Sequence, residues 1–334
     1  AFPDFADTLD SLAREGEDLF YRGEIAAALA TDSAQGGGYL RRDDMECYQL
    51  ERRQPLELSY ADARILTNPP PSTGGILIAF ALALLGEDAF RNEKFGSQHH
   101  LQKLISAMML TNEARIESNL HQNLGQGAAD TLLDPGFLES YRKRILGRPK
   151  AHRGTTQISV IDNAGNAASL TLSNGEGSAY IVPDTGIMMN NMLGEEDINP
   201  HGFNQWPEDI RMCSMMTPSL IEGRNGEITA LGSGGSNRIR TAILQVIINL
   251  IDFRMPLCEA IESPRLHFEK GLLSVEDGFD EAELASLQGQ VSNVKAWGER
   301  NMFFGGVHAA HYEPVAGHLE GAGDPRRGGI CLRA

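Results

Sequence analysis

A hairpin signal in the middle of the chain constrains the fold more than any other feature. Apolar residues alternate with polar ones at Ile158 and Val160 and again from 168 to 172, on either side of a turn at 163–166 that contains Gly and Asn. A period of two is typical of β-strands, and a short Asn/Gly turn between two such runs predicts a β-hairpin. We therefore expect a mainly β second half that starts at about residue 155.

The rest of the second half repeats this pattern and adds a helix. Asn225-Gly226, a dipeptide suited to a tight hairpin turn, separates the apolar runs 219–221 and 228–230. A long helix is expected from about Asn237, because apolar residues recur there at helical spacing. They are Ile239, Ile243, Val246, Ile247 and Leu250.

The first 125 or so residues instead predict mostly helix. Phe5, Leu9 and Leu12 share one helical face, and further helices are expected at 76–85 and at about 98–120. Helices in one half and antiparallel hairpins in the other predict a layered α+β domain.

Composition argues against several classes of function. The net charge of −16 argues against nucleic acid and anionic membranes as partners, because binding to their phosphates needs Lys and Arg. The longest apolar run, 76–85, is too short to span a bilayer. The cysteines form no CxxC pair and the histidines match no metal-binding spacing, so we predict neither a metal site nor a cofactor.

The segment between the two halves has the composition of an exposed connection. Gly, Asp and Pro open the stretch 125–154, and a basic run that includes Arg142, Lys143 and Arg144 follows. Exposed tips are the places where chains are nicked. A cut here would divide the chain in two, and a solvated linker that stays intact is the alternative.

Thr155 is the candidate nucleophile. A hydroxyl is a poor nucleophile at neutral pH unless a base lies beside it. One solution is to cleave the chain before the residue, so that its new α-amino group becomes the base. Cleavage between Gly154 and Thr155 would achieve this. The alternative is a strand that begins with Thr155 and Thr156, since threonine favours strands.

A glycine-rich turn is the second candidate element. Residues 231–237, Leu-Gly-Ser-Gly-Gly-Ser-Asn, lie between a predicted strand and the predicted long helix. Small residues allow backbone N–H groups to point into one concavity at a helix N-terminus, which suits the oxyanion of an acyl-transfer reaction. Phosphate is disfavoured because no P-loop lysine follows. A tight turn without a ligand is the other alternative.

Three further polar segments are candidates for substrate binding. Hairpin geometry can bring Ser173 and Asn174 back beside Thr155, although Ser and Asn also favour plain turns. The acidic residues around Glu195 suit a substrate ammonium, with a solvated turn as the alternative. Ser214 suits donation to a substrate carboxylate.

Together these segments resemble the γ-glutamyltranspeptidase family, in order and in spacing, over essentially the whole chain. The matching segments are Pro69–Ser72, Thr155–Thr156, Asp162–Asn166, Gly186–Asn191, Met216–Pro218, Gly232–Gly235 with Arg238, Ser263–Arg265 and Asp324–Arg326. The resemblance implies an N-terminal nucleophile hydrolase fold, an αββα sandwich of two stacked antiparallel sheets between helical layers. It also implies a precursor that cleaves itself into a large and a small subunit.

The resemblance assigns roles by position, in a reaction that attacks a γ-glutamyl amide such as glutathione and passes the acyl group to an amine or to water. Thr155 would be the nucleophile, released by cleavage after Gly154. The other positions are Thr156 and Ser173 as supports, Gly235 and Ser236 as the oxyanion hole, Asn174 and Glu195 near the substrate ammonium, and Ser214 near its carboxylate.

Several residues depart from the family pattern. Gln157 stands where His is common, Met192 for a glutamine, Met215 for the second of two serines, and Ser173 for a threonine. Each lost hydrogen-bonding side chain would weaken recognition by roughly 1 kcal/mol or more if the groups are buried. An amidase for a glutaryl or cephalosporin-type acyl group is therefore one alternative. An unprocessed, non-catalytic fragment with the same fold is another.

The resemblance also sets expectations for organisation. Residues 1–154 would be the C-terminal part of the large-subunit region and 155–334 the small subunit, both parts of one domain. Family precursors carry a longer N-terminal segment, and a chain that begins at Ala1 without Met is expected to be a processed or truncated product. The subunits would stay associated after cleavage, and a homodimer is left open. The family implies a periplasmic or secreted location, and the cytoplasm is left open.

Overall fold

The chain divides into two compact units. The smaller consists of residues 1–53 and 174–192, and the larger of 54–173 and 193–334. Residues of both predicted subunits, 1–154 and 155–334, occur in each unit, so the unit boundaries differ from the predicted cleavage site. Cleavage at 154/155 stays a prediction. The computed structural model describes residues 2–120, 127–142, 155–195, 198–199, 202–287 and 291–333.

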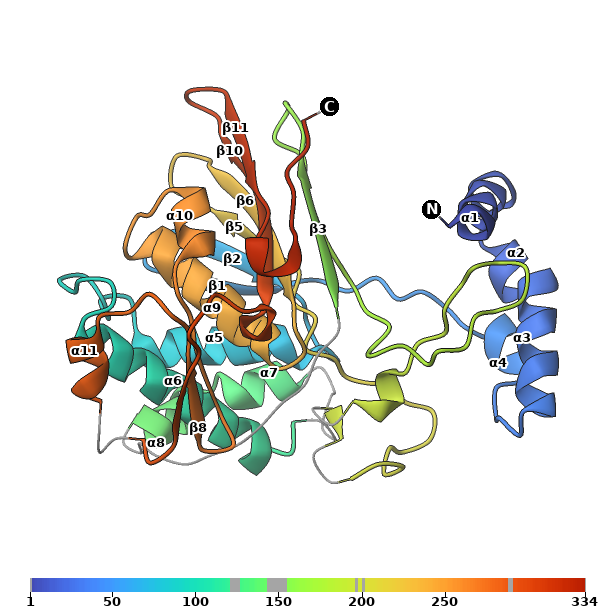
Figure 1. The fold of residues 1–334 in the computed structure, drawn as a ribbon, viewed down its shortest axis with the longest axis horizontal. Coiled ribbons are helices and arrows are strands. Elements are labelled where there is room, and N and C mark those ends of the chain that lie inside the picture. The colour runs from blue at the N-terminus through green and yellow to red at the C-terminus, as the bar shows by residue number, and fades with distance from the viewer. Residues whose placement is uncertain are drawn as a thin grey trace. The chain divides into compact units, whose positions relative to one another are not determined.

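The smaller unit is a group of short helices with the returning segment 174–192 packed on them. Its helices are α1 (Pro3–Glu15), α2 (Asp18–Tyr21), α3 (Glu24–Gln35) and α4 (Arg42–Glu46) (Figure 1). Its core holds Ile25, Ala26, Leu29, Met45 and Val182. The predicted helix around Phe5 and Leu9 forms, but these two side chains are 39% and 50% exposed, so the apolar stripe of α1 is not buried.

The larger unit is built on an antiparallel sheet. Among the described residues, six strands pair in the order β1-β2-β5-β6-β10-β11. Strands β6 and β10 pair so that Gly234 lies opposite Gly306 and Gly232 lies opposite His308. The strands are β1 (Leu56–Tyr60), β2 (Ala63–Thr67), β5 (Ser219–Glu222), β6 (Ile228–Gly234), β10 (Gly306–Glu313) and β11 (His318–Ala322).

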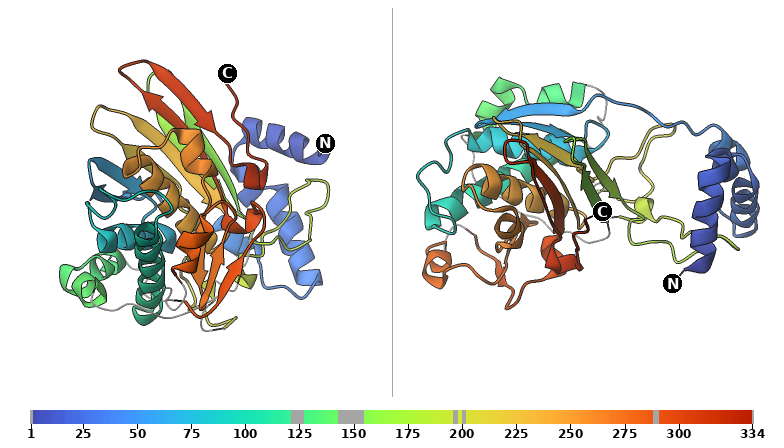
Figure 2. Two further views of the ribbon diagram at one scale, coloured as in Figure 1. Left: turned by 60° about the vertical axis from the view of Figure 1, so that its left-hand side comes forward. Right: turned by 90° about the horizontal axis from the view of Figure 1, so that it is seen from above.

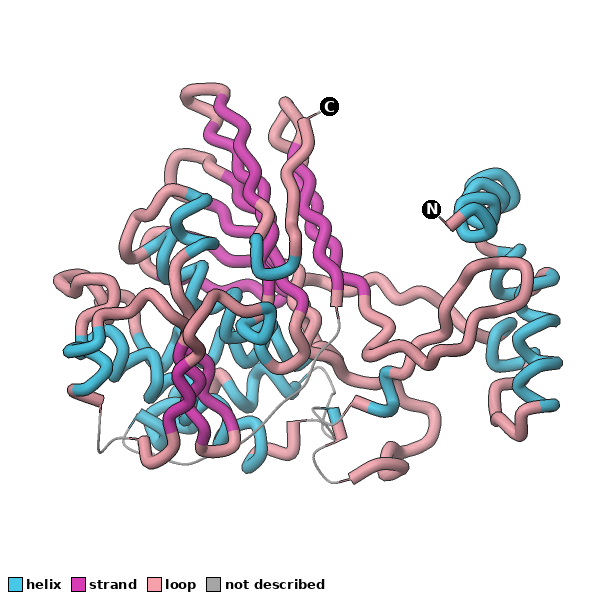
Figure 3. The backbone as a smooth tube through the Cα atoms, viewed as in Figure 1, coloured by secondary structure: helices cyan, strands magenta, loops and turns pink. Residues whose placement is uncertain are grey.

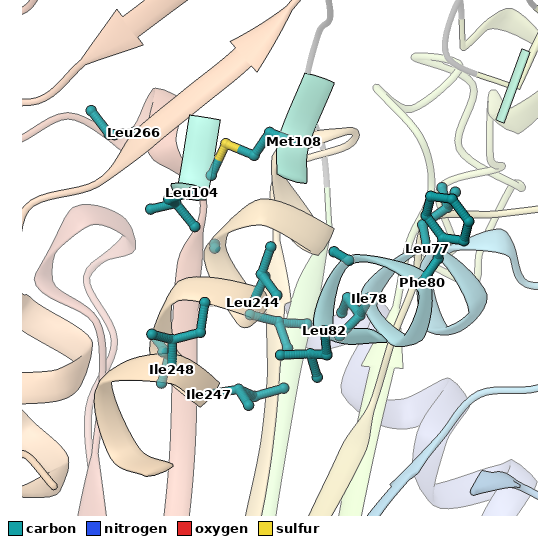
Figure 4. Close-up of a cluster of buried hydrophobic side chains, with 14 of the residues drawn as sticks. Leu77, Ile78, Phe80, Leu82, Leu104, Met108, Leu244, Ile247, Ile248 and Leu266 are labelled. Carbon is teal, nitrogen blue, oxygen red and sulfur yellow. The ribbon is translucent and has the colours of Figure 1, made fainter. Parts of the chain in front are cut away.

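One face of this sheet is covered by long apolar helices, which gather on one side of the strands in Figures 1 and 3. Alternate strand residues such as Leu231 and Val307 point into that layer and are fully buried. Figure 4 shows how side chains of α5, α6 and α9 interdigitate beside Leu266. The helices of the unit are α5 (Thr73–Leu85), α6 (Gln98–Glu117), α7 (Gly127–Leu132), α8 (Pro135–Arg142), α9 (Arg238–Ile251), α10 (Leu257–Glu262) and α11 (Glu281–Ala285).

The other face of the sheet carries the hairpin β3 (Thr156–Ile161) and β4 (Ala167–Leu172). The Ser159 hydroxyl donates to the carbonyl of His308 at 3.0 Å, and the Ser169 hydroxyl to that of Leu231 at 2.8 Å. The polar face of the hairpin therefore packs on β6 and β10. Its apolar face points outward, with Ile158, Val160, Leu170 and Leu172 between 47% and 56% exposed.

A small mixed sheet completes the described part of the larger unit (orange in Figure 2). Its strands are β7 (Leu266–Glu269), β8 (Leu272–Val275) and β9 (Val294–Ala296), with β8 and β9 parallel. Short 3-10 turns occur at Met192–Gly194, Met302–Phe304 and Pro325–Arg327. Within the described residues, no helix combines the length and the apolar character that a membrane crossing requires.

The predicted α+β class is confirmed, as are both predicted hairpins and the helices at 76–85, 98–120 and after Asn237. The strands β1 and β2 were missed, and they lie within a region that was predicted to be mostly helical. Their signal is present in the sequence, because Leu56, Leu58 and Tyr60 alternate with polar residues, and Ala61 turns the chain with a φ of +50°.

Candidate active site

The mouth of the hairpin holds the predicted nucleophile. Thr155 directly precedes β3 and Ser173 directly follows β4, so the hairpin register makes them neighbours. The Thr155 hydroxyl donates to the Ser173 hydroxyl oxygen at 3.2 Å. Thr155 is half-buried, whereas Thr156 is exposed at the start of β3. The structure thus brings Thr155 and Ser173 together, as the hairpin pattern predicted.

The glycine-rich turn lies against this threonine. Strand β6 ends at Gly234 and helix α9 begins at Arg238, so the turn occupies the predicted strand-to-helix junction. A Cβ placed on Gly234 would lie 2.0 Å from the carbonyl oxygen of Thr155, so a side chain at 234 would collide with backbone. Direct packing of two backbones therefore holds Thr155 beside the turn.

The turn also directs a backbone donor away from the helix. The carbonyl of Gly235 accepts from the amide of Arg238 at 3.0 Å and so points into the first turn of α9. Because C=O and the following N–H point in opposite directions across a trans peptide, the N–H of Ser236 points away from the helix. Ser236 has a φ of +54°, a strained value for a residue with a side chain, and such strain clusters at functional sites.

Gln157, two residues after Thr155, fills the interface between the hairpin and β6. Its Oε1 accepts from the Thr171 hydroxyl at 2.5 Å, and its Nε2 donates to the Ser159 and Ser169 hydroxyls at 3.0 and 2.9 Å. A Cβ on Gly232 would lie 2.1 Å from Gln157 Oε1, so the contact with β6 is tight. Gln157 is thus a sheet-packing residue, and its amide is occupied by hairpin hydroxyls.

The segment of Ser214 is held by the start of α5. Its carbonyl accepts from the backbone amide of Thr73 at 2.9 Å and from the Thr73 hydroxyl at 3.2 Å. The next residue, Met215, is buried in the core, where its sulfur accepts from the Thr73 hydroxyl at 3.4 Å. The Met215 side chain therefore points into the protein, while the Ser214 side chain is half-buried.

The two residues expected near a substrate ammonium lie in different units. Glu195 is buried in the larger unit, and its carbonyl accepts from the Asn199 side chain at 2.8 Å. Asn174 belongs to the smaller unit, where its Nδ2 donates to the Met188 carbonyl at 3.4 Å. Gly154, most of the basic run 142–153, and the acidic residues 196–197 lie outside the described residues.

The family is decided by a comparison over the whole length. The model of the Gamma-glutamyltranspeptidase family matches residues 1–333. The chain belongs to this family. Its structure also resembles the crystal structure of cephalosporin acylase from Bacillus halodurans, with a TM-score of 0.81 and 25% identity, over 98% of this chain and 61% of that one. The predicted N-terminal nucleophile hydrolase fold is therefore confirmed.

The chain matches curated relatives of at least two kinds. The glutathione hydrolase proenzyme of Escherichia coli (strain K12) is 28% identical over an alignment 363 positions long, gaps included, and the alignment covers 96% of this chain and 59% of the relative. The Acylase ACY 1 proenzyme of Pseudomonas sp. (strain SE83) is 31% identical over 333 residues, with the same coverage of both chains. The chain thus spans about three fifths of the length of these relatives.

Two of the family segments noted in the sequence meet in a buried ionic cluster. Arg265 Nη2 contacts Asp324 Oδ2 at 2.7 Å, and Arg326 Nη2 contacts Glu276 Oε2 at 2.5 Å. Burial opposes ionisation of Asp324, but Arg265 and Arg326 outweigh it and hold the pKa of that carboxyl below its usual value. Asp324 also accepts from the amide of Val307 at 3.0 Å, so the cluster anchors the start of β10 next to the glycine turn.

Sequence reasoning missed the partners within this cluster. Glu276 carries no motif of its own, and its role becomes visible only because β8 brings it to Arg326. Among the described residues, no group of three or more His, Cys, Asp or Glu side chains is arranged to hold a metal ion.

Proposed function

We propose that this chain is the catalytic part of a self-processing acyltransferase or hydrolase that cleaves γ-glutamyl amides. Membership of the family and its glutathione hydrolase relatives support the substrate class. The observation that carries the proposal is the contact of Thr155 with both Ser173 and the glycine-rich turn.

The reaction proposed begins with cleavage of the Gly154–Thr155 bond. The freed α-amino group of Thr155 then takes the proton from its own hydroxyl, and the hydroxyl oxygen attacks the amide carbonyl of the substrate. Ser173, 3.2 Å from that oxygen, orients the hydroxyl. The amine leaves with the proton, and a γ-glutamyl ester on Thr155 remains.

The negative oxygen of the tetrahedral intermediate needs fixed donors. The N–H of Ser236, which is directed away from α9, supports the proposal that the turn supplies them, with Gly235 as the second donor. Water or an amine then attacks the ester and releases the acyl group. Thr156, Asn174, Glu195 and Ser214 keep the supporting and substrate-binding roles that the family pattern assigns to them.

A glutaryl or cephalosporin-type amidase is the second candidate. It is favoured by Met215, whose thioether is buried in the core where the family has a second serine, so one polar contact to an amino-acid substrate is missing. The Acylase ACY 1 proenzymes among the relatives are in line with it. Both candidates share the chemistry at Thr155 and differ in the acyl group.

The test of the chemistry is Thr155→Ala, with Thr131→Ala on the exposed surface of α7 as the matched control. Intact-mass analysis of the wild type and the control is expected to find two pieces that separate between 154 and 155, and the Thr155 variant is expected to stay whole and inactive. Cleavage and turnover in Thr155→Ala would refute the proposal. A wild type that stays uncut and binds without turnover would point to the non-catalytic alternative.

The test of the acyl group compares γ-glutamyl and glutaryl p-nitroanilides at equal concentration. A higher kcat/KM for the γ-glutamyl compound supports the preferred substrate. The reverse order favours the amidase.

A further inference from the structure

A buried polar cluster lies directly behind the glycine-rich turn, where α9 begins. It joins three elements, α6, α9 and β7, and none of its members is more than 6% exposed. The members are Asn112, Arg115, Asn237, Arg240, Thr241, His267 and Glu269. Burying this many polar groups lowers the stability of the fold unless they form hydrogen bonds with one another, so we expect the cluster to serve a function.

Asn237 connects the cluster to the turn. It follows Ser236 directly and precedes the first residue of α9. Asparagine at this position commonly caps its own helix, but here the side chain makes no capping hydrogen bond. Instead its Nδ2 donates to Glu269 Oε1 at 2.7 Å, and its Oδ1 accepts from Arg115 at 3.2 Å. Asn237 therefore ties the turn to β7 and α6.

Glu269 is itself held from several sides. His267 Nε2 lies 3.1 Å from Glu269 Oε2, and His267 Nδ1 lies 2.9 Å from the Thr241 hydroxyl oxygen. Burial lowers the pKa of His267 to about 4, so the ring is neutral at neutral pH. A carboxylate only accepts, so Nε2 carries the single ring proton and Nδ1 accepts from Thr241. Arg115 and Arg240 lie 3.9 Å from the carboxylate and support its charge.

We propose that Glu269 is a positioning residue, which acts through Asn237 to hold the Gly235–Ser236 turn in the shape that acyl transfer requires. This inference rests on the proposed function of the turn. The positive φ of Ser236 persists only if the surroundings over-determine it, and the two bonds to Asn237 supply that constraint. Oxyanion donors are effective only when they are fixed before the reaction.

The kinetic test uses Asn237→Ala and Glu269→Gln. Asn249→Ala is the matched control, because Asn249 is equally buried on the same helix and donates to the Ala260 carbonyl at 3.0 Å, far from the turn. We expect kcat to fall on the order of ten- to a hundred-fold in the two cluster variants, with KM changed less than about threefold. The control is expected to lower Tm but to keep kcat.

A double variant measures the coupling. If Glu269 acts through Asn237, the kcat of Asn237→Ala combined with Glu269→Gln is close to that of Asn237→Ala alone. Independent, multiplicative losses would overturn the inference. So would a loss of kcat in Asn249→Ala that matches the cluster variants at equal Tm, because the effect would then be general destabilisation.

Hydrogen exchange at residues 234–238 separates this inference from the proposed function. Faster exchange of these amides in both cluster variants, but not in Asn249→Ala, supports the positioning role even if the wild type has no turnover. Unchanged exchange at the turn would overturn it, whatever the activity.

Discussion

The two faces of the six-stranded sheet are packed by different means. Toward the helices, residues such as Ile65, Leu231 and Val307 are buried against apolar side chains. On the face toward the hairpin, β6 carries Gly232 and Gly234, which have no side chains. The hairpin packs hydroxyl groups and the side-chain amide of Gln157 against them. The first face is stabilised by the removal of apolar area from water, which is non-directional.

The hairpin face is held instead by directional contacts, namely hydrogen bonds and close backbone packing. Hydrogen bonds and backbone contacts are satisfied only in one register, so they hold Thr155 at a defined place against the turn. We therefore expect the helix face to contribute most of the stability and the hairpin face most of the positional precision.

Gly234→Ala is expected to have the largest effect. The new Cβ would lie 2.0 Å from the carbonyl oxygen of Thr155, and neither backbone can yield without moving the hairpin. Overpacking of this kind typically costs about 1–3 kcal/mol, and more where backbone must move. Processing and turnover should both be lost.

The matched substitution is Gly232→Ala, which collides with the side chain of Gln157 rather than with backbone. Pairing it with Gln157→Ala should restore part of the stability, measured by urea unfolding. Normal cleavage in Gly234→Ala would show that close backbone packing at Thr155 is dispensable.

We expect the helix layer to make the stability of the fold depend on pH, with an effect of intermediate size. His100 is buried among Phe90, Phe95 and Phe253, and burial lowers its pKa from 6.5 to about 4. The unfolded chain therefore binds the proton first, and stability falls as the pH drops from about 6.5 toward 4. The slope contributed by this group approaches about 1.4 kcal/mol per pH unit.

His100→Asn keeps an acceptor for the amide of Gly96, which donates to His100 Nδ1 at 3.1 Å. Unfolding free energies measured between pH 4 and 7 should show a flatter dependence in this variant. An unchanged slope would mean that His100 titrates alike in both states.

The outer face of the hairpin should give the smallest effect. Leu170 is 48% exposed, so Leu170→Ala should cost less than about 1 kcal/mol. Leu244→Ala, in the fully packed helix layer of Figure 4, should cost about 2–5 kcal/mol. Equal costs by chemical denaturation would show that the outer face is covered in solution.

Local patterns were sufficient for the parts of the fold that are encoded over short distances. The turn at 163–166 set the hairpin register, and that register placed Ser173 beside Thr155. The helical spacing after Asn237 and the small residues before it located the strand-to-helix turn. The family motifs extended this to the fold class, because their order along the chain is specific.

Local patterns did not predict which residues far apart in the sequence would contact one another. Glu269 and Asn237 are separated by more than thirty positions in sequence, and neither stands out by its neighbours. The cluster of Asp324 with Arg265 likewise joins two motifs that the sequence keeps far apart. A single sequence records which residues are polar but not which of them will share one buried site.

The positions of the strands, the helices and the key turn could be predicted from the sequence, because they depend on periodicity, on glycine and on the backbone of a few neighbouring residues. The face of the hairpin that turns inward is fixed instead by packing in the folded protein. An alternating strand is equally consistent with either face inside, and the apolar one is the usual choice. Here Gly232 and Gly234 allow close approach, and the hydroxyls of Ser159 and Ser169 find carbonyl partners on β6 and β10, so the polar face is the buried one.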